Sequence, residues 1–319
     1  MKVVFLGTPD FAVGALNKIN EAFDVVAVVT QPDKPKGRSG KPVFSPVKEE
    51  ALRLNLPVYQ FEKIRKDGVE VLKSLNADVF VTCAYGQILS QEIIDIPKHG
   101  IMNIHASLLP KYRGAAPIQW AIINGDEYTG VTIMRTEAGI DTGDILLAES
   151  IKIGERETAG ELFDRLAILG SELIVKALKL LESGNAKFVK QDENLATHVR
   201  MLTKEDGLID WSKTPKQIFD LVRGTDPWPG AFTYYNGKLL KIRSVEIYQK
   251  ETSGAFGEVI VSDKNEGIVV RTNGGAIKIT ELQLEGAKRM SSHDFLLGRS
   301  LKQGEILGKT EAFDANENN

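Results

Sequence analysis

The chain has 319 residues and a formal net charge of −3; 42% of its residues are apolar and 26% are charged. This length and composition are typical of a globular protein of about two domains, and they exclude a disordered or collagen-like chain. The single cysteine, Cys83, excludes an intrachain disulfide and a cysteine-based zinc cluster, and the four histidines show no HxxxH spacing, so we expect no metal.

The sequence contains no transmembrane pattern, which would need about 18 or more consecutive apolar residues. The apolar run at residues 3–6 is too short for the core of a signal peptide. We therefore expect a cytoplasmic protein without a membrane partner.

The first half of the chain alternates strand and helix patterns. Apolar, β-branched runs predict strands at residues 2–6, 25–30, 78–83 and 100–104, and helical spacing occurs at 11–20, 45–54 and 68–75. This alternation favours an α/β fold with a Rossmann-like, doubly wound and mainly parallel sheet. Functional loops are then expected at the carboxyl ends of the strands.

The second half changes character. Apolar residues spaced by three and four predict a long helix over 162–181, and residues 189–206 are polar and aperiodic. Beyond them, five short strands separated by glycine-containing turns predict a small antiparallel barrel, preceded by a helix near 215–223. We expect a first domain at 1–188, a linker at 189–206, a barrel domain at 207–314 and a polar tail at 315–319.

Charge is concentrated in one segment, residues 31–48. It carries five Lys or Arg residues against Asp33 alone, with four prolines and two glycines, which predicts an exposed loop. Residues 207–319, by contrast, hold 15 basic and 15 acidic residues. The overall charge therefore does not indicate a general nucleic-acid binder.

Two groups of residues are candidates for chemistry. Asn103 and His105 lie two residues apart at the end of a predicted strand, so their side chains share one face and can both bond a developing oxyanion. Asp141 lies in a glycine-containing acidic stretch and can orient an imidazole or take a proton. By spacing alone, structural roles are favoured over catalytic ones: a buried histidine with a strand-end asparagine, and a turn aspartate. The first turn, GTPDFA at 7–12, lacks the GxGxxG pattern of dinucleotide sites, and no GxxxxGK[ST] phosphate loop occurs.

Longer motifs decide between these readings. They are FLGTPDFA (5–12), TQPDKPKGR (30–38), AYGQIL (84–89), NIHASLLPKYRGAAPIQWAI (103–122), GVTIMRTEAGIDTGDIL (130–146) and DPWPGA (226–231). With them the chain resembles, over residues 1–313, the methionyl-tRNA formyltransferases, a family of formyltetrahydrofolate-dependent enzymes.

The resemblance implies a catalytic domain joined to an OB-type barrel that contacts tRNA. It implies transfer of the formyl group of 10-formyltetrahydrofolate to the α-amino group of initiator methionyl-tRNA, by a monomer, with Asn103, His105 and Asp141 as catalytic residues. The implied folate contacts are Gly86, Gln87, Ile88, Leu89, Ser107, Leu108, Leu109 and Pro110. The implied tRNA contacts are Lys36, Arg38 and Lys41.

The expected mechanism is direct attack of the neutral amine on the formyl carbon, without a covalent enzyme intermediate. Asn103 and protonated His105 donate to the oxyanion, and Asp141 orients His105 and helps to take the amine proton. Two alternatives remain. One is a relative that formylates a nucleotide sugar or glycinamide ribonucleotide, and the other is a non-enzymatic RNA-binding protein.

Overall fold

The computed structural model describes residues 1–35, 42–299 and 301–308, and the chain divides into two compact units. Unit 1 consists of Met1–Pro117, Tyr128–Lys152 and Leu162–Arg200, and unit 2 of Ile118–Glu127, Ile153–Glu161 and Met201–Asn319. Within the described ranges, no helix combines the length and the apolar character needed to cross a lipid bilayer.

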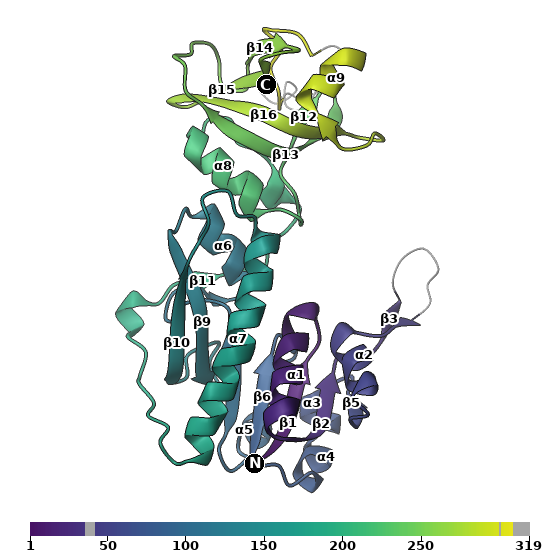
Figure 1. Cartoon of the computed structure of the whole chain (residues 1–319), viewed down its shortest axis with the longest axis vertical. Helices are drawn as coiled ribbons and strands as arrows, with labels where there is room; N and C mark the ends of the chain where they lie inside the picture. Colours follow the sequence, from purple (N-terminus) through teal and green to yellow (C-terminus); the bar gives the residue numbers. More distant parts are fainter. Residues whose placement is uncertain (36–41, 300, 309–319) are drawn as a thin grey trace, which may run out of the picture. The chain divides into compact units, whose positions relative to one another are not determined.

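Unit 1 is built on a seven-stranded sheet in the order β10-β9-β7-β6-β1-β2-β5 (Figure 1). Its strands are β1 (Lys2–Gly7), β2 (Asp24–Thr30), β5 (Val58–Gln60), β6 (Val79–Cys83), β7 (Ile101–His105), β9 (Tyr128–Arg135) and β10 (Ile145–Lys152). Five neighbouring strands, β7, β6, β1, β2 and β5, pair in parallel, whereas β9 and β10 are antiparallel to their neighbours. The expected doubly wound, mainly parallel sheet is confirmed. The short strand β5 was not predicted, because a three-residue, half-buried strand gives almost no periodic signal.

Helices cover both faces of this sheet. They are α1 (Val13–Ala22), α2 (Pro46–Arg53), α3 (Ile64–Asp67), α4 (Val69–Ser74), α5 (Gln91–Ile94) and α7 (Ala159–Glu182), and a 3₁₀ turn, η1 (Asp10–Ala12), precedes α1. On one face, alternate strand residues such as Leu6 and Ile101 share a buried cluster with residues of α3, α4 and α5. On the other face, a Cβ at Gly170 of α7 would lie 2.9 Å from Ile104 of β7. Ile101, Asn103 and His105 therefore face away from α7.

The basic segment 31–48 is only partly the irregular loop that its prolines predict. Its described ends form a two-stranded ribbon of β3 (Lys34–Pro35) and β4 (Pro42–Val43), and α2 begins at Pro46. The Lys48 ammonium lies 2.5 Å from Asp33 Oδ2, and Gln60 Nε2 donates to Asp33 Oδ1 over 2.9 Å; these two contacts lower the pKa of the Asp33 carboxyl. One of the five basic residues of this segment, Lys48, is thus already paired within the protein.

Residues 189–206, expected as a linker, are divided between the two units. Up to Arg200 they belong to unit 1, where β11 (His198–Val199) pairs in parallel with β8 (Arg113–Gly114). A 3₁₀ turn, η2 (Glu193–Leu195), precedes β11. Hydrogen bonds rather than apolar periodicity hold this stretch, which explains why its sequence resembles a linker.

Unit 2 contains an antiparallel sheet in the order β12-β13-β16-β15-β14, with β17 paired to β16. The elements are α6 (Pro117–Ile123), η3 (Glu205–Gly207), α8 (Pro215–Gly224), β12 (Phe232–Tyr235), β13 (Lys238–Tyr248), β14 (Val259–Asp263), β15 (Gly267–Thr272), β16 (Gly275–Leu284), β17 (Met290–Ser291) and α9 (Ser292–Gly298). Both outer strands of the sheet hydrogen-bond to residues 304–308, through Val259 N to Glu305 O (2.8 Å) and Gly308 N to Tyr234 O (2.9 Å). This segment connects the two edges, so the predicted antiparallel domain is confirmed.

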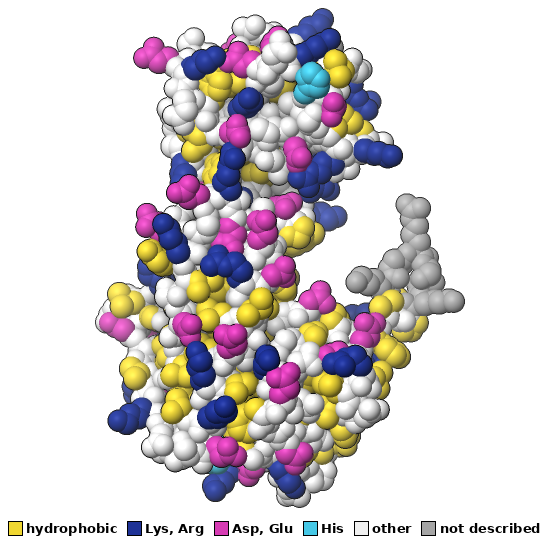
Figure 2. Space-filling model, in the orientation of Figure 1, with side chains coloured by type: hydrophobic (Ala, Val, Ile, Leu, Met, Phe, Trp, Pro, Cys, Tyr) yellow, Lys and Arg dark blue, Asp and Glu magenta, His cyan; other side chains and the backbone are white. Residues whose placement is uncertain are grey.

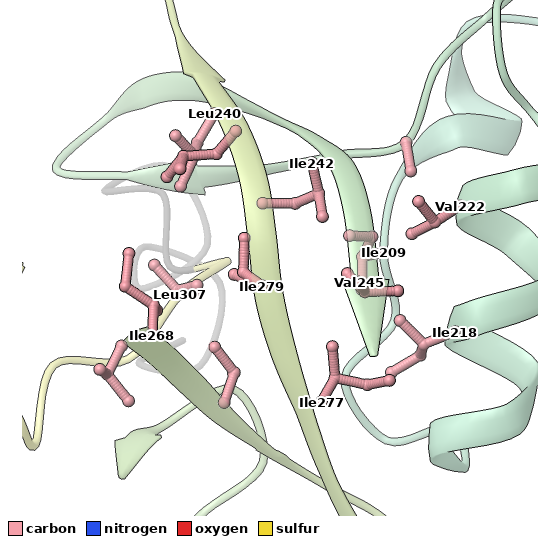
Figure 3. Packing of buried hydrophobic residues seen from close by; sticks show 14 of the residues in the cluster. Ile209, Ile218, Val222, Leu240, Ile242, Val245, Ile268, Ile277, Ile279 and Leu307 are labelled. Atoms are coloured by element: carbon pink, nitrogen blue, oxygen red, sulfur yellow. The ribbon is translucent and has the colours of Figure 1, made fainter. Parts of the chain in front are cut away.

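The core of unit 2 lies between α8 and the sheet. Figure 3 shows Ile218 and Val222 of α8 directed toward Val245 and Ile277 of the strands, and all four side chains are at most 5% exposed. Thr214 caps α8 in a reciprocal capping box with Gln217, which satisfies two amide groups at the start of the helix.

Candidate active site

Asn103 lies at the carboxyl end of β7 with its amide already oriented. It is opposite Thr82 of β6 in the strand register, and the buried Thr82 hydroxyl donates to Asn103 Oδ1 over 2.8 Å. Because Oδ1 accepts this bond, the Nδ2 group is the end of the amide that remains to donate. Thr82 was not singled out from the sequence, where it sits within an apolar strand pattern.

His105 lies two residues further along β7, on the same side of the strand, and is 6% exposed. Its Nε2 lies 3.0 Å from the main-chain oxygen of Tyr112, and its Nδ1 lies 3.6 Å from Asp141 Oδ2. A carbonyl oxygen can only accept, so Nε2 carries a proton and Nδ1 is the nitrogen that can exchange one. The structure therefore brings His105 and Asp141 together, as expected.

Asp141 is held in a strained loop between β9 and β10. Its φ of +53° is in the left-handed region, which side-chain-bearing residues seldom adopt. Its Oδ2 accepts the Gly114 amide over 2.8 Å, and its main-chain oxygen accepts Gln191 Nε2 over 2.8 Å. These contacts from two other segments account for the persistence of the strained conformation.

The turn at residues 107–110 uses most of its polar groups internally. Ser107 is fully buried, and its hydroxyl donates to Lys111 O over 2.7 Å. Thr132 Oγ1 donates to Ser107 O and accepts from Leu109 N. This turn therefore shapes the end of β7, and the proton of the Ser107 hydroxyl is used within the turn.

A cavity of about 620 Å³ opens at the carboxyl ends of β1 and β6, where the order of the parallel strands reverses. It is lined by Thr8, Pro9, Gln31, Lys34, Glu62, Lys63, Arg65, Ala84, Tyr85, Gly86, Gln87 and Ile88. Gly86, Gln87 and Ile88, three of the expected folate contacts, are among these residues, whereas Leu89 and residues 107–110 are not. Gln31 and Gln87 hydrogen-bond to each other and to main-chain oxygens at the wall. Such a switch point is where open α/β sheets bind ligands.

Burial disfavours the ionised forms of two side chains near the strand ends. Burial raises the pKa of the Cys83 thiol, which disfavours the reactive thiolate. Burial also raises the pKa of Tyr85 to about 12, and its hydroxyl has no hydrogen-bond partner among the described residues. The described site thus offers an amide, an imidazole and a carboxylate, and its one thiol is shielded.

The expected tRNA contacts Lys36, Arg38 and Lys41 lie outside the described residues. Besides Thr82, sequence reasoning missed Arg113 and Gln191. Arg113 is 1% exposed and makes paired hydrogen bonds to Glu193 that raise its pKa. No local pattern in the sequence distinguishes such a buried arginine from a surface one.

Most of the chain matches the formyl transferases. A family model described as "Formyl transferase" matches residues 1–178, and one described as "Formyl transferase, C-terminal domain" matches residues 201–300. A sugar 3N-formyl transferase, WlaRD, solved with dTDP and 5-N-formyl-THF, superposes with a TM-score of 0.67 at 20% identity, covering 90% of this chain and 99% of that one. An N-formyltransferase from Helicobacter canadensis, in complex with folinic acid and dTDP-3-aminofucose, also gives 0.67 at 20% identity, covering 91% and 100%. At this identity the likeness shows the fold.

Closer relatives are far more similar in sequence. The methionyl-tRNA formyltransferase of Lachnospira eligens is 50% identical over 316 residues, covering 97% of this chain and all of the relative. That of Geobacter metallireducens is 49% identical over 310 residues, covering 97% and 99%. The chain belongs to the methionyl-tRNA formyltransferase family.

Proposed function

We propose that this chain transfers the formyl group of 10-formyltetrahydrofolate to the α-amino group of initiator methionyl-tRNA, with Asn103, His105 and Asp141 as its catalytic residues. The observation that carries this assignment is the convergence at the end of β7. There an amide whose oxygen is already bonded lies on the same side of the strand as an imidazole held between a main-chain carbonyl and a carboxylate.

Asn103 stabilises the oxyanion. When the amine attacks the formyl carbon, the C=O π bond opens and its oxygen becomes negative. The Nδ2 group, left available by the Thr82 bond, donates to that oxygen. Loss of one such preorganised donor typically lowers the rate by about 10²–10³-fold.

His105 and Asp141 handle the proton and share in binding the oxyanion. Their 3.6 Å separation is beyond hydrogen-bond range, so an Nδ1–H is not fully engaged by the carboxylate and can also donate to the substrate oxygen. Asp141 accepts the proton that the amine loses as the C–N bond forms. The oxyanion then re-forms the C=O bond as the bond from carbon to N10 breaks, Asp141 gives up the proton that it took from the amine, N10 receives it, and tetrahydrofolate leaves.

The formyl donor is a substrate, and the residues present suit it. The proposed contacts lie in two segments, Gly86, Gln87, Ile88 and Leu89 in the first and Ser107, Leu108, Leu109 and Pro110 in the second. Ile88 is 78% exposed, and Ile140, next to Asp141, is 68% exposed. Covering an exposed apolar side chain with a flat ring removes apolar surface from water, which favours binding. The main-chain and glutamine groups can hydrogen-bond to the polar edge of a pterin.

The tRNA is proposed to bind through Lys36, Arg38 and Lys41 and through unit 2. On the face drawn in Figure 2, the Lys and Arg side chains of the described part of unit 2 are interspersed with Asp and Glu. This mixed surface favours loose contact there and a larger contribution from the basic segment. Every proposed catalytic residue lies within unit 1 of one chain, so we propose a monomer.

The test is formyl transfer to charged initiator tRNA, measured for the full chain and for Asn103→Ala, His105→Ala and Asp141→Asn. We expect no product without 10-formyltetrahydrofolate and a fall in kcat of about 10²-fold or more in each variant. Exposed Lys190→Gln is the control and should turn over normally. A variant that is folded and retains kcat removes its residue from the catalytic set, and failure to formylate the tRNA refutes the function.

A further inference from the structure

Gln191 connects a buried arginine to the loop that carries Asp141. Its Oε1 accepts from Arg113 Nε (3.1 Å) and Nη2 (2.9 Å), and its Nε2 donates to the main-chain oxygens of Asp141 and Gly143, each over 2.8 Å. Arg113 is in turn paired with Glu193. One amide thus satisfies a cation on one side and two carbonyls on the other.

Thr197, six residues further on, holds the other partner of His105. Its hydroxyl accepts the Tyr112 amide over 2.8 Å, its own amide donates to Pro110 O over 3.2 Å, and its oxygen accepts Arg113 N over 2.8 Å. Tyr112 supplies the carbonyl that faces His105 Nε2. Residues 191–199 therefore hold the main chain on both sides of the imidazole.

The chemistry of position 191 distinguishes positioning from packing. If a partner for buried Arg113 were the only requirement, a carboxylate would serve better, because charge-assisted hydrogen bonds to arginine are stronger. A carboxylate cannot donate to the carbonyls of Asp141 and Gly143. Of the common side chains, an amide meets both demands at this length.

We propose that Gln191 is a positioning residue for formyl transfer and that the segment 191–199, with Thr197, sets the geometry of His105 between Tyr112 and Asp141. This inference rests on the proposed function, because it acts through the proposed catalytic pair. It adds a segment that contacts the main chain of Asp141 and Tyr112 and whose sequence resembles a linker.

The experiment compares Gln191→Glu, Gln191→Leu and the control Lys190→Gln in the full chain. The readouts are kcat, KM for both substrates and the thermal midpoint. Gln191→Glu keeps an acceptor for Arg113 and loses the donor to the Asp141 loop. We expect its thermal midpoint to fall less than that of Gln191→Leu, because Arg113 keeps its acceptor, while kcat falls by about tenfold or more and KM for tRNA changes by less than about threefold. Gln191→Leu should lose both activity and stability. A Gln191→Glu variant with parental kcat would overturn the proposal, because packing alone tolerates that change.

A double-mutant cycle with Asp141→Asn separates this inference from the proposed function. If Gln191 acts through Asp141, adding Gln191→Glu to Asp141→Asn should lower kcat by less than about twofold more. Fully additive losses overturn the inference. If Asp141→Asn alone retains full turnover, the proposed function of Asp141 fails. If it is impaired and Gln191→Glu is not, only the inference fails.

Discussion

The hydrogen bond from Thr82 to Asn103 predicts that buried Thr82 affects the kcat of formyl transfer by orienting the Asn103 amide. Thr82→Val replaces the hydroxyl with a methyl group of nearly the same size, so the strand packing of β6 is kept. Asn103 Oδ1 then faces an apolar group inside a largely buried site. Leaving a buried acceptor unpaired costs about 1–3 kcal/mol, which the side chain relieves by rotating its oxygen away.

That rotation removes Nδ2 from the oxyanion. If the productive orientation becomes unfavourable by about 1–2 kcal/mol, kcat falls by about 5–30-fold. This is less than the 10²–10³-fold expected for Asn103→Ala, because the amide is still present and part of the population remains productive. KM for tRNA should not change.

Thr82→Ser is the matched control. It loses a buried methyl group and so destabilises the fold by about 1 kcal/mol, comparable to the valine variant, but it keeps the donor. Steady-state formylation and urea unfolding of both variants separate the two effects. If Thr82→Val and Thr82→Ser show the same kcat within about twofold, the orientation argument is refuted.

Three further predictions follow from other positions. Gly114→Ala should abolish most activity and destabilise unit 1 by about 3 kcal/mol or more, because its φ is +101° and a Cβ would lie 2.4 Å from Val199 O. Its control, Gly184→Ala, has a positive φ but nothing within 4 Å, so it should cost only about 1 kcal/mol in urea unfolding. Equal losses in the two variants would contradict the clash. Tyr85→Phe should be at least as stable as the parent at pH 7, because the Tyr85 hydroxyl has no hydrogen-bond partner among the described residues. The phenol of Tyr85 ionises near pH 10 in the unfolded chain and has a pKa of about 12 in the folded one, so the parent loses stability as the pH rises from 10 to 12. The variant should lose less, which unfolding at pH 7 and 10.5 would show. Arg38→Ala should raise KM for tRNA more than Lys36→Ala or Lys41→Ala, because arginine bonds phosphate in a bidentate way, and the penalty should shrink at high salt, as it does for phosphate contacts. Equal, salt-independent effects in kinetics at two salt concentrations would disprove it.

The sheet of unit 1 was predictable because its strands are continuous apolar runs and its helices are periodic. Strand alternation and a glycine-containing loop place Asn103, His105 and Asp141 at a sheet edge, so these residues could be proposed as catalytic. Spacing alone was also consistent with purely structural roles for them. Their supporting residues could not be predicted in the same way. Thr82 is one hydroxyl within an apolar run, and Gln191 acts through hydrogen bonds that span 50 residues to Asp141 and 78 to Arg113. Polar contacts at such separation leave no periodic trace.

This separation also has a consequence for the order in which the enzyme is assembled. Strands β1 to β7 precede residue 106, and they can bury their apolar faces as soon as the helices between them have formed. Gln191 and Thr197 come more than 80 residues later, after β9, β10 and the long helix α7. A nascent chain, or a fragment that ends at residue 188, therefore contains all three proposed catalytic side chains but not the segment that holds them in register. The positioning role that we propose for residues 191–199 therefore predicts that such a fragment can form the sheet but lacks most of the catalytic activity.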